Sequence, residues 1–188
     1  MRKLVQYTLT SLDGAVDDPR RYFPGSDPTT ASPPTFDATM IELERELIGR
    51  QDTVLLGRTT FDEWSHYWPT SDEQPFADFI NGVEKVIVTS TPLTTEWPGA
   101  QAATEPVAEI VRALKARPGG DIGVHGSITL ARSLLDAGLV DELHLAMGPV
   151  LDPLGRRLFD GLGDLRRLEL LRATSTPGGS VWLTYRVA

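Results

Sequence analysis

The sequence of 188 residues contains no cysteine and only three histidines. The lack of cysteine excludes disulfide bonds, thiolate catalysis and cysteine-ligated zinc or iron–sulfur sites. The histidines, His66, His125 and His144, are not spaced like metal ligands, so we expect no metal site. Basic residues are also few, since 18 Lys and Arg stand against 26 Asp and Glu for a net charge of −8. We expect no nucleic-acid partner, because neutralising a phosphate backbone needs clustered basic side chains.

Long apolar runs are missing as well. No segment approaches the roughly 20 apolar residues that cross a bilayer. Asp13 and Gly14 lie where a signal peptide would need its hydrophobic region. We therefore expect a cytoplasmic protein with no membrane partner. The sequence also lacks a Gly-x-Gly-x-x-Gly motif after its first strand and a Walker-type Gly-Lys-Ser/Thr motif, which excludes a standard Rossmann site and a nucleoside triphosphatase.

What the sequence does contain is a regular alternation of short apolar runs with amphipathic stretches. Helices are expected at residues 36–48, 107–114 and 130–135, with a shorter one ending near residue 64, and strands at residues 4–9, 53–56, 83–88, 121–125, 140–147, 168–174 and 180–187. This order predicts an α/β fold, a three-layer α/β/α sandwich with a mostly parallel mixed sheet and a C-terminal antiparallel hairpin. With no repeat and no linker, residues 1–188 are expected to form one domain.

Polar residues follow four of the expected strands, where the ligand site of an open α/β sheet lies. Residues 57–60 (Gly-Arg-Thr-Thr) have the composition of a phosphate-binding turn: a glycine, a helix N-terminus, hydroxyl groups and one arginine. The same four residues also suit an ordinary strand–helix turn with a threonine cap. Residues 89–91 and 126–127 allow the same two interpretations, and residues 10–14 end the first strand.

These segments together resemble a known family. The motifs are Ser-Leu-Asp-Gly at 11–14, Gly-Arg-Thr-Thr-Phe at 57–61, the strand and turn at 85–92, and Gly-Leu-Val-Asp-Glu-Leu at 138–143. In this order and spacing they resemble the dihydrofolate reductase superfamily, and more closely its branch containing the reductase domain of riboflavin biosynthesis. The resemblance spans nearly the whole chain and implies an NADPH-dependent reductase.

The resemblance also implies which residues hold NADPH. It places Arg58 at the adenosine 2′-phosphate with Ser90 and Thr89, and Gly57, Thr59 and Thr60 along the pyrophosphate. Gly126 and Ser127 would bracket the phosphate on the nicotinamide side, and Leu9, Thr10 and Val16 would border the nicotinamide. In the family the bond matching Gly126–Ser127 joins two glycines and is cis. With serine as the second residue, a cis bond costs about 3 kcal/mol, which leaves its isomer open.

The substrate side departs from the family pattern. The position of the acidic residue that holds the pterin in dihydrofolate reductases falls on Ile41, which argues against dihydrofolate as the natural substrate. Glu42 is the next residue, and one step along a helix turns its side chain by about 100°, away from the expected substrate pocket. Asp13 is the remaining candidate catalytic residue, and stabilising the turn before Gly14 is its alternative role. We expect Phe36 and Trp64 to contact substrate. The resemblance places a lid at residues 17–34, and Tyr22, Phe23 and Phe36 would close over the substrate with it.

The function expected from the resemblance is NADPH-dependent hydride transfer to a small heterocyclic or carbonyl-type substrate. One alternative is the 5-amino-6-(5-phosphoribosylamino)uracil reductase of the riboflavin pathway, which would need a separate deaminase. The other is a protein that binds NADPH without catalysis. We further expect a homodimer, formed through the edge at residues 140–147 or through the C-terminal hairpin.

Overall fold

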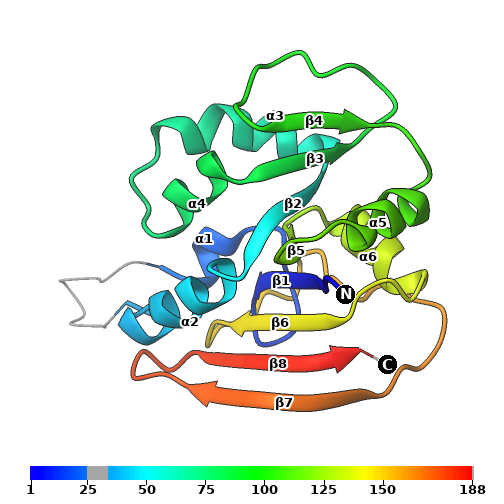
Figure 1. The fold of residues 1–188 in the computed structure, drawn as a ribbon. Helices are drawn as coiled ribbons and strands as arrows, with labels where there is room; N and C mark the ends of the chain where they lie inside the picture. The colour runs from blue at the N-terminus through cyan, green and yellow to red at the C-terminus, as the bar shows by residue number, and fades with distance from the viewer. Residues whose placement is uncertain (25–33, 188) are drawn as a thin grey trace.

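The computed structural model describes residues 1–24 and 34–187, which form one sheet of eight strands with helices on both faces (Figure 1). The strand order is β4-β3-β2-β5-β1-β6-β8-β7. The strands are β1 (Leu4–Thr10), β2 (Gln51–Gly57), β3 (Glu84–Val88), β4 (Ala100–Ala103), β5 (Asp121–His125), β6 (Glu142–Met147), β7 (Leu168–Ser175) and β8 (Val181–Val187). The helices are α1 (Pro19–Tyr22), α2 (Ala38–Ile48), α3 (Arg58–Tyr67), the 3-10 helix η1 (Trp68–Thr70), α4 (Phe76–Gly82), α5 (Val107–Ala116) and α6 (Ile128–Asp136).

Alternating side chains of each central strand separate the two helical layers. Leu4 of β1 packs with α5 and α6, whereas the next residue, Val5, packs under α2. In β2 the same alternation directs Leu55 to the first layer and Leu56 toward α3 and α4. Because successive strand residues point to opposite faces, the apolar runs of the sequence build two cores. This confirms the expected three-layer sandwich.

The parallel and antiparallel parts of the sheet are also as expected. Strands β4, β3, β2, β5, β1 and β6 run parallel, and β8 pairs antiparallel with both β6 and β7. The carboxyl ends of the parallel strands therefore meet at one edge of the sheet. The prediction that residues 140–147 form an edge strand is wrong. Strand β6 lies between β1 and β8, and β7 is the edge strand at this end of the sheet.

Helix α2 begins at Ala38, two residues after the expected start, and ends at Ile48 as predicted. The Asp37 carboxylate accepts hydrogen bonds from the backbone N–H groups of Thr39 (3.0 Å) and Met40 (3.1 Å), which caps the helix. Four short elements were not predicted from the sequence, namely α1, α4, the 3-10 helix η1 and β4. Strand β4 has the sequence Ala-Gln-Ala-Ala and forms by pairing with β3, without a strand-like pattern of its own.

The proline-rich stretch at residues 17–34 starts as the short helix α1. Tyr22 of this helix is buried, and its hydroxyl donates a hydrogen bond to the Asp17 carboxylate (2.9 Å). It is therefore a core residue, not a free part of a lid. Residues 25–33, the centre of the expected lid, lie outside the described residues. Within residues 1–24 and 34–187, no helix has the length and apolar character needed to span a membrane.

Candidate functional site

The starts of two helices meet at the carboxyl edge of the parallel strands. Helix α3 begins directly after Gly57 of β2, and α6 begins after Gly126 and Ser127, which follow β5. The Ser127 hydroxyl accepts a hydrogen bond from the Gly57 N–H (2.9 Å) and donates one to the Thr60 hydroxyl (2.7 Å). A single serine therefore ties together two helix N-termini, and anions bind favourably at such positions.

Close packing explains the glycine at position 57. A Cβ atom there would lie 3.3 Å from the Ser127 Oγ and 3.4 Å from its Cβ. Gly126 and Ser127 both adopt left-handed backbone conformations, with φ of 61° and 56°. Among the described residues only the Gln74–Pro75 bond is cis, so the Gly126–Ser127 bond is trans. The two left-handed residues make this turn, at a lower cost than a cis bond to serine.

A hollow of about 490 Å³ opens beside α3 at the ends of β3 and β4, and we call it the β3–β4 groove. Its lining residues are Arg58, Val88, Thr89, Ser90, Thr91, Ala103, Thr104 and Glu105. The Arg58 guanidinium bonds both Asp62 carboxylate oxygens through Nε (2.8 and 2.9 Å), and its Nη1 donates to the Thr91 hydroxyl (2.6 Å). This fork holds a cationic group at the mouth of the groove. The structure thus brings together Arg58, Thr89 and Ser90, as the sequence predicts.

Four further predicted residues lie at or near this edge. Thr10 ends β1, and its carbonyl accepts a hydrogen bond from the Gly148 N–H (2.8 Å). Leu9 packs on the α2 side of the sheet. Val16 packs against Ala131 of α6, close to the start of that helix. Thr59 lies exposed in the first turn of α3.

Asp13 is occupied by contacts that hold the loop after β1. One carboxylate oxygen accepts hydrogen bonds from the Asp152 N–H (2.9 Å) and the Ser11 hydroxyl (2.7 Å). The other pairs with Arg157 (2.9 Å). The Asp152 N–H is the largest of the causes that lower the pKa of Asp13 from 3.8, and the Ser11 hydroxyl and Arg157 add to it. A carboxylate with a lowered pKa is a weak source of protons, so this geometry favours the turn-stabilising role.

The two predicted substrate-contact residues lie in different aromatic clusters. Trp64 packs edge-on against Trp68 and Phe76, whereas Phe36 packs edge-on against Phe23 under α2. The buried His125 ring contacts Phe76 of the Trp64 cluster and also contacts Tyr7. Burial lowers the pKa of His125 to about 3, so its imidazole is neutral at pH 7.

Glu44 is a buried acid that was not predicted from the sequence. It lies on the inner face of α2, one turn beyond Ile41, and accepts a hydrogen bond from the Tyr7 hydroxyl (3.2 Å). Burial raises the pKa of Glu44 to about 7. Glu42 is exposed and pairs with Arg45 (2.6 Å), as expected of a surface residue. The signal for Glu44 is its position between Leu43 and Leu47, on the apolar face of the helix.

Comparison with known proteins identifies the family. Residues 2–182 match the family described as the RibD C-terminal domain. Over 144 residues the chain is 27% identical to an uncharacterized protein, YyaP, of Bacillus subtilis, a match that covers 74% of this chain and 76% of that one.

Solved structures share the fold. One is a pyrimidine reductase-like protein from Corynebacterium diphtheriae (TM-score 0.68, 19% identity, covering 100% of this chain and 92% of that one). Another is a Thermotoga maritima diaminohydroxyphosphoribosylaminopyrimidine deaminase/5-amino-6-(5-phosphoribosylamino)uracil reductase (TM-score 0.68, 15% identity), and this chain covers 57% of its length. The match over residues 2–182 shows that the chain belongs to the RibD C-terminal domain family.

Proposed function

We propose that this chain is an NADPH-dependent oxidoreductase that reduces a small heterocyclic or carbonyl-type substrate. The observation that carries the proposal is the junction made by Ser127, which holds the N-termini of α3 and α6 together beside the β3–β4 groove. Two helix N-termini next to an arginine and several hydroxyl groups match the needs of a dinucleotide that carries three phosphate groups. Membership of a family that includes reductases adds support.

The chemical groups at this edge are of the kind that NADPH needs. Arg58, Thr89 and Ser90 would hold the 2′-phosphate at the groove, and Thr59 and Thr60 the pyrophosphate at the start of α3. Gly57 and Gly126 let the two turns pack closely, because a Cβ atom at Gly57 would lie 3.3 Å from the Ser127 Oγ and one at Gly126 would lie 3.4 Å from Trp64. NADPH supplies the hydride when bound. The chain itself contributes alignment and exclusion of water.

The substrate would lie near the end of β1, bordered by Leu9, Trp64 and Phe36. No acid stands at Ile41, so the substrate is of a kind that does not depend on a carboxylate there. Family membership favours a ribosylaminopyrimidine of the riboflavin pathway as the specific candidate. The acid one helical turn beyond Ile41 is Glu44, and its carboxylate accepts a hydrogen bond from the Tyr7 hydroxyl.

Titration of NADPH and NADH, followed by tryptophan fluorescence, tests the cofactor assignment. We expect Arg58→Ala to weaken NADPH binding about tenfold or more, because charge-assisted hydrogen bonds to the phosphate are lost, and to leave NADH binding nearly unchanged. Arg45→Ala is the matched control, since Arg45 is exposed on α2 and pairs only with Glu42 among the described residues. Equal NADPH affinity in wild type and Arg58→Ala would refute the assignment.

Turnover separates an enzyme from a binding protein. NADPH oxidation is measured against pterins, ribosylaminopyrimidines and ketones, and we expect one class to support turnover. Tight NADPH binding without oxidation of any class would favour a protein that binds the nucleotide without catalysis.

We also propose that the protein forms a homodimer through the C-terminal hairpin. Strand β7 ends the sheet, and Leu168, Leu170 and Leu171 on it are exposed. An edge strand with exposed leucines is suited to pairing with a second copy.

A further inference from the structure

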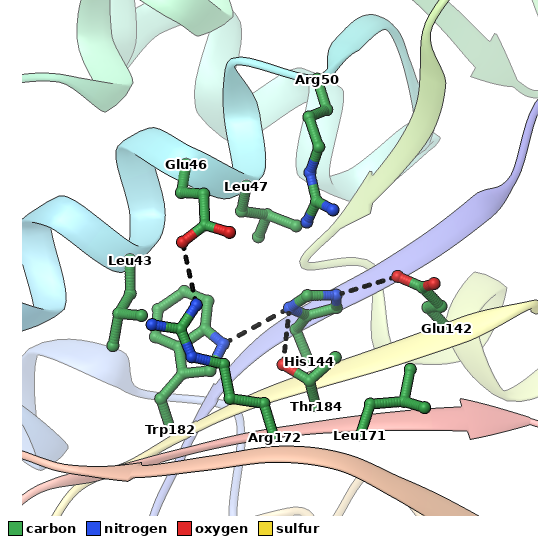
Figure 2. A pocket seen from close by; sticks show the side chains of 10 residues that line it. All are labelled: Leu43, Glu46, Leu47, Arg50, Glu142, His144, Leu171, Arg172, Trp182 and Thr184. Atoms are coloured by element: carbon green, nitrogen blue, oxygen red, sulfur yellow. Dashed lines mark hydrogen bonds and ion pairs between the residues drawn. The ribbon is translucent and has the colours of Figure 1, made fainter.

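A second cavity lies under α2, over the half of β6 away from the β3–β4 groove (Figure 2). It has a volume of about 190 Å³, and we call it the α2 cavity. Its ceiling is the last two turns of α2 and its floor is the antiparallel part of the sheet. The cavity includes Glu142 and His144 from the first half of β6, whereas the groove lies at the carboxyl ends of β3 and β4. The two hollows are therefore at opposite edges of the sheet.

The periodicity of each element explains which side chains line the cavity. Leu43, Glu46, Leu47 and Arg50 are spaced three, four and seven residues apart, so they share one face of α2 and its continuation. Alternate residues of the strands face them from below. His144 of β6 is paired in register with Thr184 of β8, and Arg172 of β7 is paired with the same threonine.

The polar groups that face the cavity are mainly hydrogen-bond donors. His144 is 4% exposed, and its Nδ1 accepts a hydrogen bond from the Trp182 indole (3.3 Å), which leaves the proton of the neutral ring on Nε2. That Nε2–H has only a long contact of 3.5 Å with Glu142. Figure 2 shows the Arg50 guanidinium above the imidazole ring, and the Arg172 guanidinium at the opposite side of the opening.

The carboxylates at the cavity are already paired, but Arg50 is not. Glu46 binds Arg172 (2.9 Å), and Glu142 binds Lys3 (2.6 Å). Within residues 1–24 and 34–187, the Arg50 side chain has no salt-bridge partner. Its backbone is nevertheless fixed, because its carbonyl accepts a hydrogen bond from the Asp121 N–H (2.7 Å). The cavity thus presents an exposed guanidinium with no carboxylate partner among the described residues, beside an imidazole N–H whose acceptor, the Glu142 carboxylate, is 3.5 Å away.

The apolar side chains that line the α2 cavity indicate what the rest of the ligand would be. Leu43, Leu47 and Leu171 are apolar, and the buried indole of Trp182 forms a flat surface beside them. Ligand pockets commonly combine such walls with a few polar groups that fix orientation. The volume of about 190 Å³ is below the roughly 300–1,000 Å³ typical of drug-sized ligands. It therefore suits a molecule with one small ring or a short chain.

We propose that the α2 cavity is a second binding site, for a small organic carboxylate whose anionic group binds Arg50 and the His144 Nε2–H and whose apolar body packs against Trp182 and the leucines. The site is separate from the proposed cofactor site and does not depend on it. Arg172 remains bonded to Glu46 and closes the opposite side of the cavity.

Benzoate is a suitable probe, because it combines a carboxylate with one flat ring. The assay is a titration of the full chain followed by 1H–15N NMR at the Trp182 indole N–H, which is assigned with Trp182→Phe. We expect a saturable shift of this signal with benzoate and a much weaker one with benzamide, which has the same shape without the charge. Arg50→Gln should weaken benzoate binding about tenfold or more, whereas Arg45→Gln, on the outer face of α2, should not.

Three results would overturn the proposal: no saturable shift at Trp182, equal binding of benzoate and benzamide, or equal loss of affinity in Arg50→Gln and Arg45→Gln. Addition of NADPH distinguishes the two sites. Benzoate displaced by NADPH, with no shift at Trp182, would mean that it binds in the β3–β4 groove instead. The benzamide comparison uses the wild-type chain, so it remains decisive even if Arg50→Gln fails to fold.

Discussion

The Tyr7 hydroxyl donates a hydrogen bond of 3.2 Å to the Glu44 carboxylate, and both side chains are buried between α2 and β1. Glu44 is only 7% exposed, and burial is the main reason that its pKa rises from 4.5 to about 7. The hydrogen bond from Tyr7 favours the charged carboxylate and so lowers the pKa of Glu44, against the effect of burial. The pKa of Tyr7 itself is raised by burial and by the neighbouring carboxylate. The free energy of unfolding should therefore depend on pH through Glu44.

Glu44→Gln should change how stability depends on pH. In the wild type the folded carboxyl has the higher pKa, so its contribution to stability is full below pH 4.5 and is lost as the pH rises to about 7. This rise in the pKa of Glu44 corresponds to about 3 kcal/mol of unfolding free energy. Urea denaturation at pH 5 and pH 8 should show that Glu44→Gln lacks this loss and is the more stable variant at pH 8.

The control for this experiment is Glu42→Gln, on the exposed face of the same helix. It should keep the wild-type pH dependence, because Glu42 is paired with Arg45 at the surface. His125 and His144 act in the opposite direction. Their lowered pKa values remove stability as the pH falls below 6.5, but they are present in all three proteins and so do not affect the comparison. An unchanged pH dependence in Glu44→Gln would contradict the assignment.

Asp62→Asn should strengthen NADPH binding. Both carboxylate oxygens of Asp62 accept hydrogen bonds from the Arg58 Nε, and the carboxylate adds a negative charge beside the β3–β4 groove. Removing that charge leaves Arg58 available for the 2′-phosphate, and we expect a several-fold lower Kd for NADPH with little change for NADH. Fluorescence titration measures both constants. Glu63→Gln, an exposed neighbour on α3, should change neither, and an equal gain for NADH and NADPH in Asp62→Asn would show that Arg58 is not the 2′-phosphate ligand.

Asp13→Asn distinguishes the two roles of Asp13. Its carboxylate holds Ser11, Asp152 and Arg157, so we expect a lower melting temperature and little change in kcat for the fraction that is folded. Because the pKa of Asp13 is lowered, its contribution is present above its unfolded value of 3.8 and is lost as the pH falls below it. Thermal unfolding and NADPH oxidation are measured on the same samples, with the exposed Asp164→Asn as control. A large fall in kcat at an unchanged melting temperature would instead identify a catalytic residue.

That residues 57–60 and 126–127 lie at the same edge of the sheet could be predicted, because parallel strands place their carboxyl ends at one edge. Their contact also requires β2 and β5 to be neighbours, which the local pattern does not show. The hydroxyl link from Ser127 to Thr60 could not be predicted, since it depends on a separation of 67 residues along the chain. The same holds for Glu44, whose helix face is evident from Leu43 and Leu47, but whose partner Tyr7 lies 37 residues away.

Strand order was the other property that local pattern could not supply. Residues 140–147 have the same alternation whether they lie at an edge or between two strands, and the position of β6 is decided by its pairing with β1 and β8. Strand β4 likewise exists because β3 offers an unpaired edge, since its four small or polar residues have little preference for a strand.

Leu170→Glu tests the proposed dimer. Leu170 is 53% exposed on β7, the strand that ends the sheet, so the substitution removes an apolar contact without disturbing the core. Light scattering after size-exclusion chromatography should show a dimer for the wild type and a monomer for Leu170→Glu, because a charge opposite its own copy is repelled across a two-fold axis. Leu154→Glu, at a residue 94% exposed in the segment after β6, is the control and should remain a dimer. A monomeric wild type would refute the homodimer, and a dimeric Leu170→Glu would move the interface away from β7.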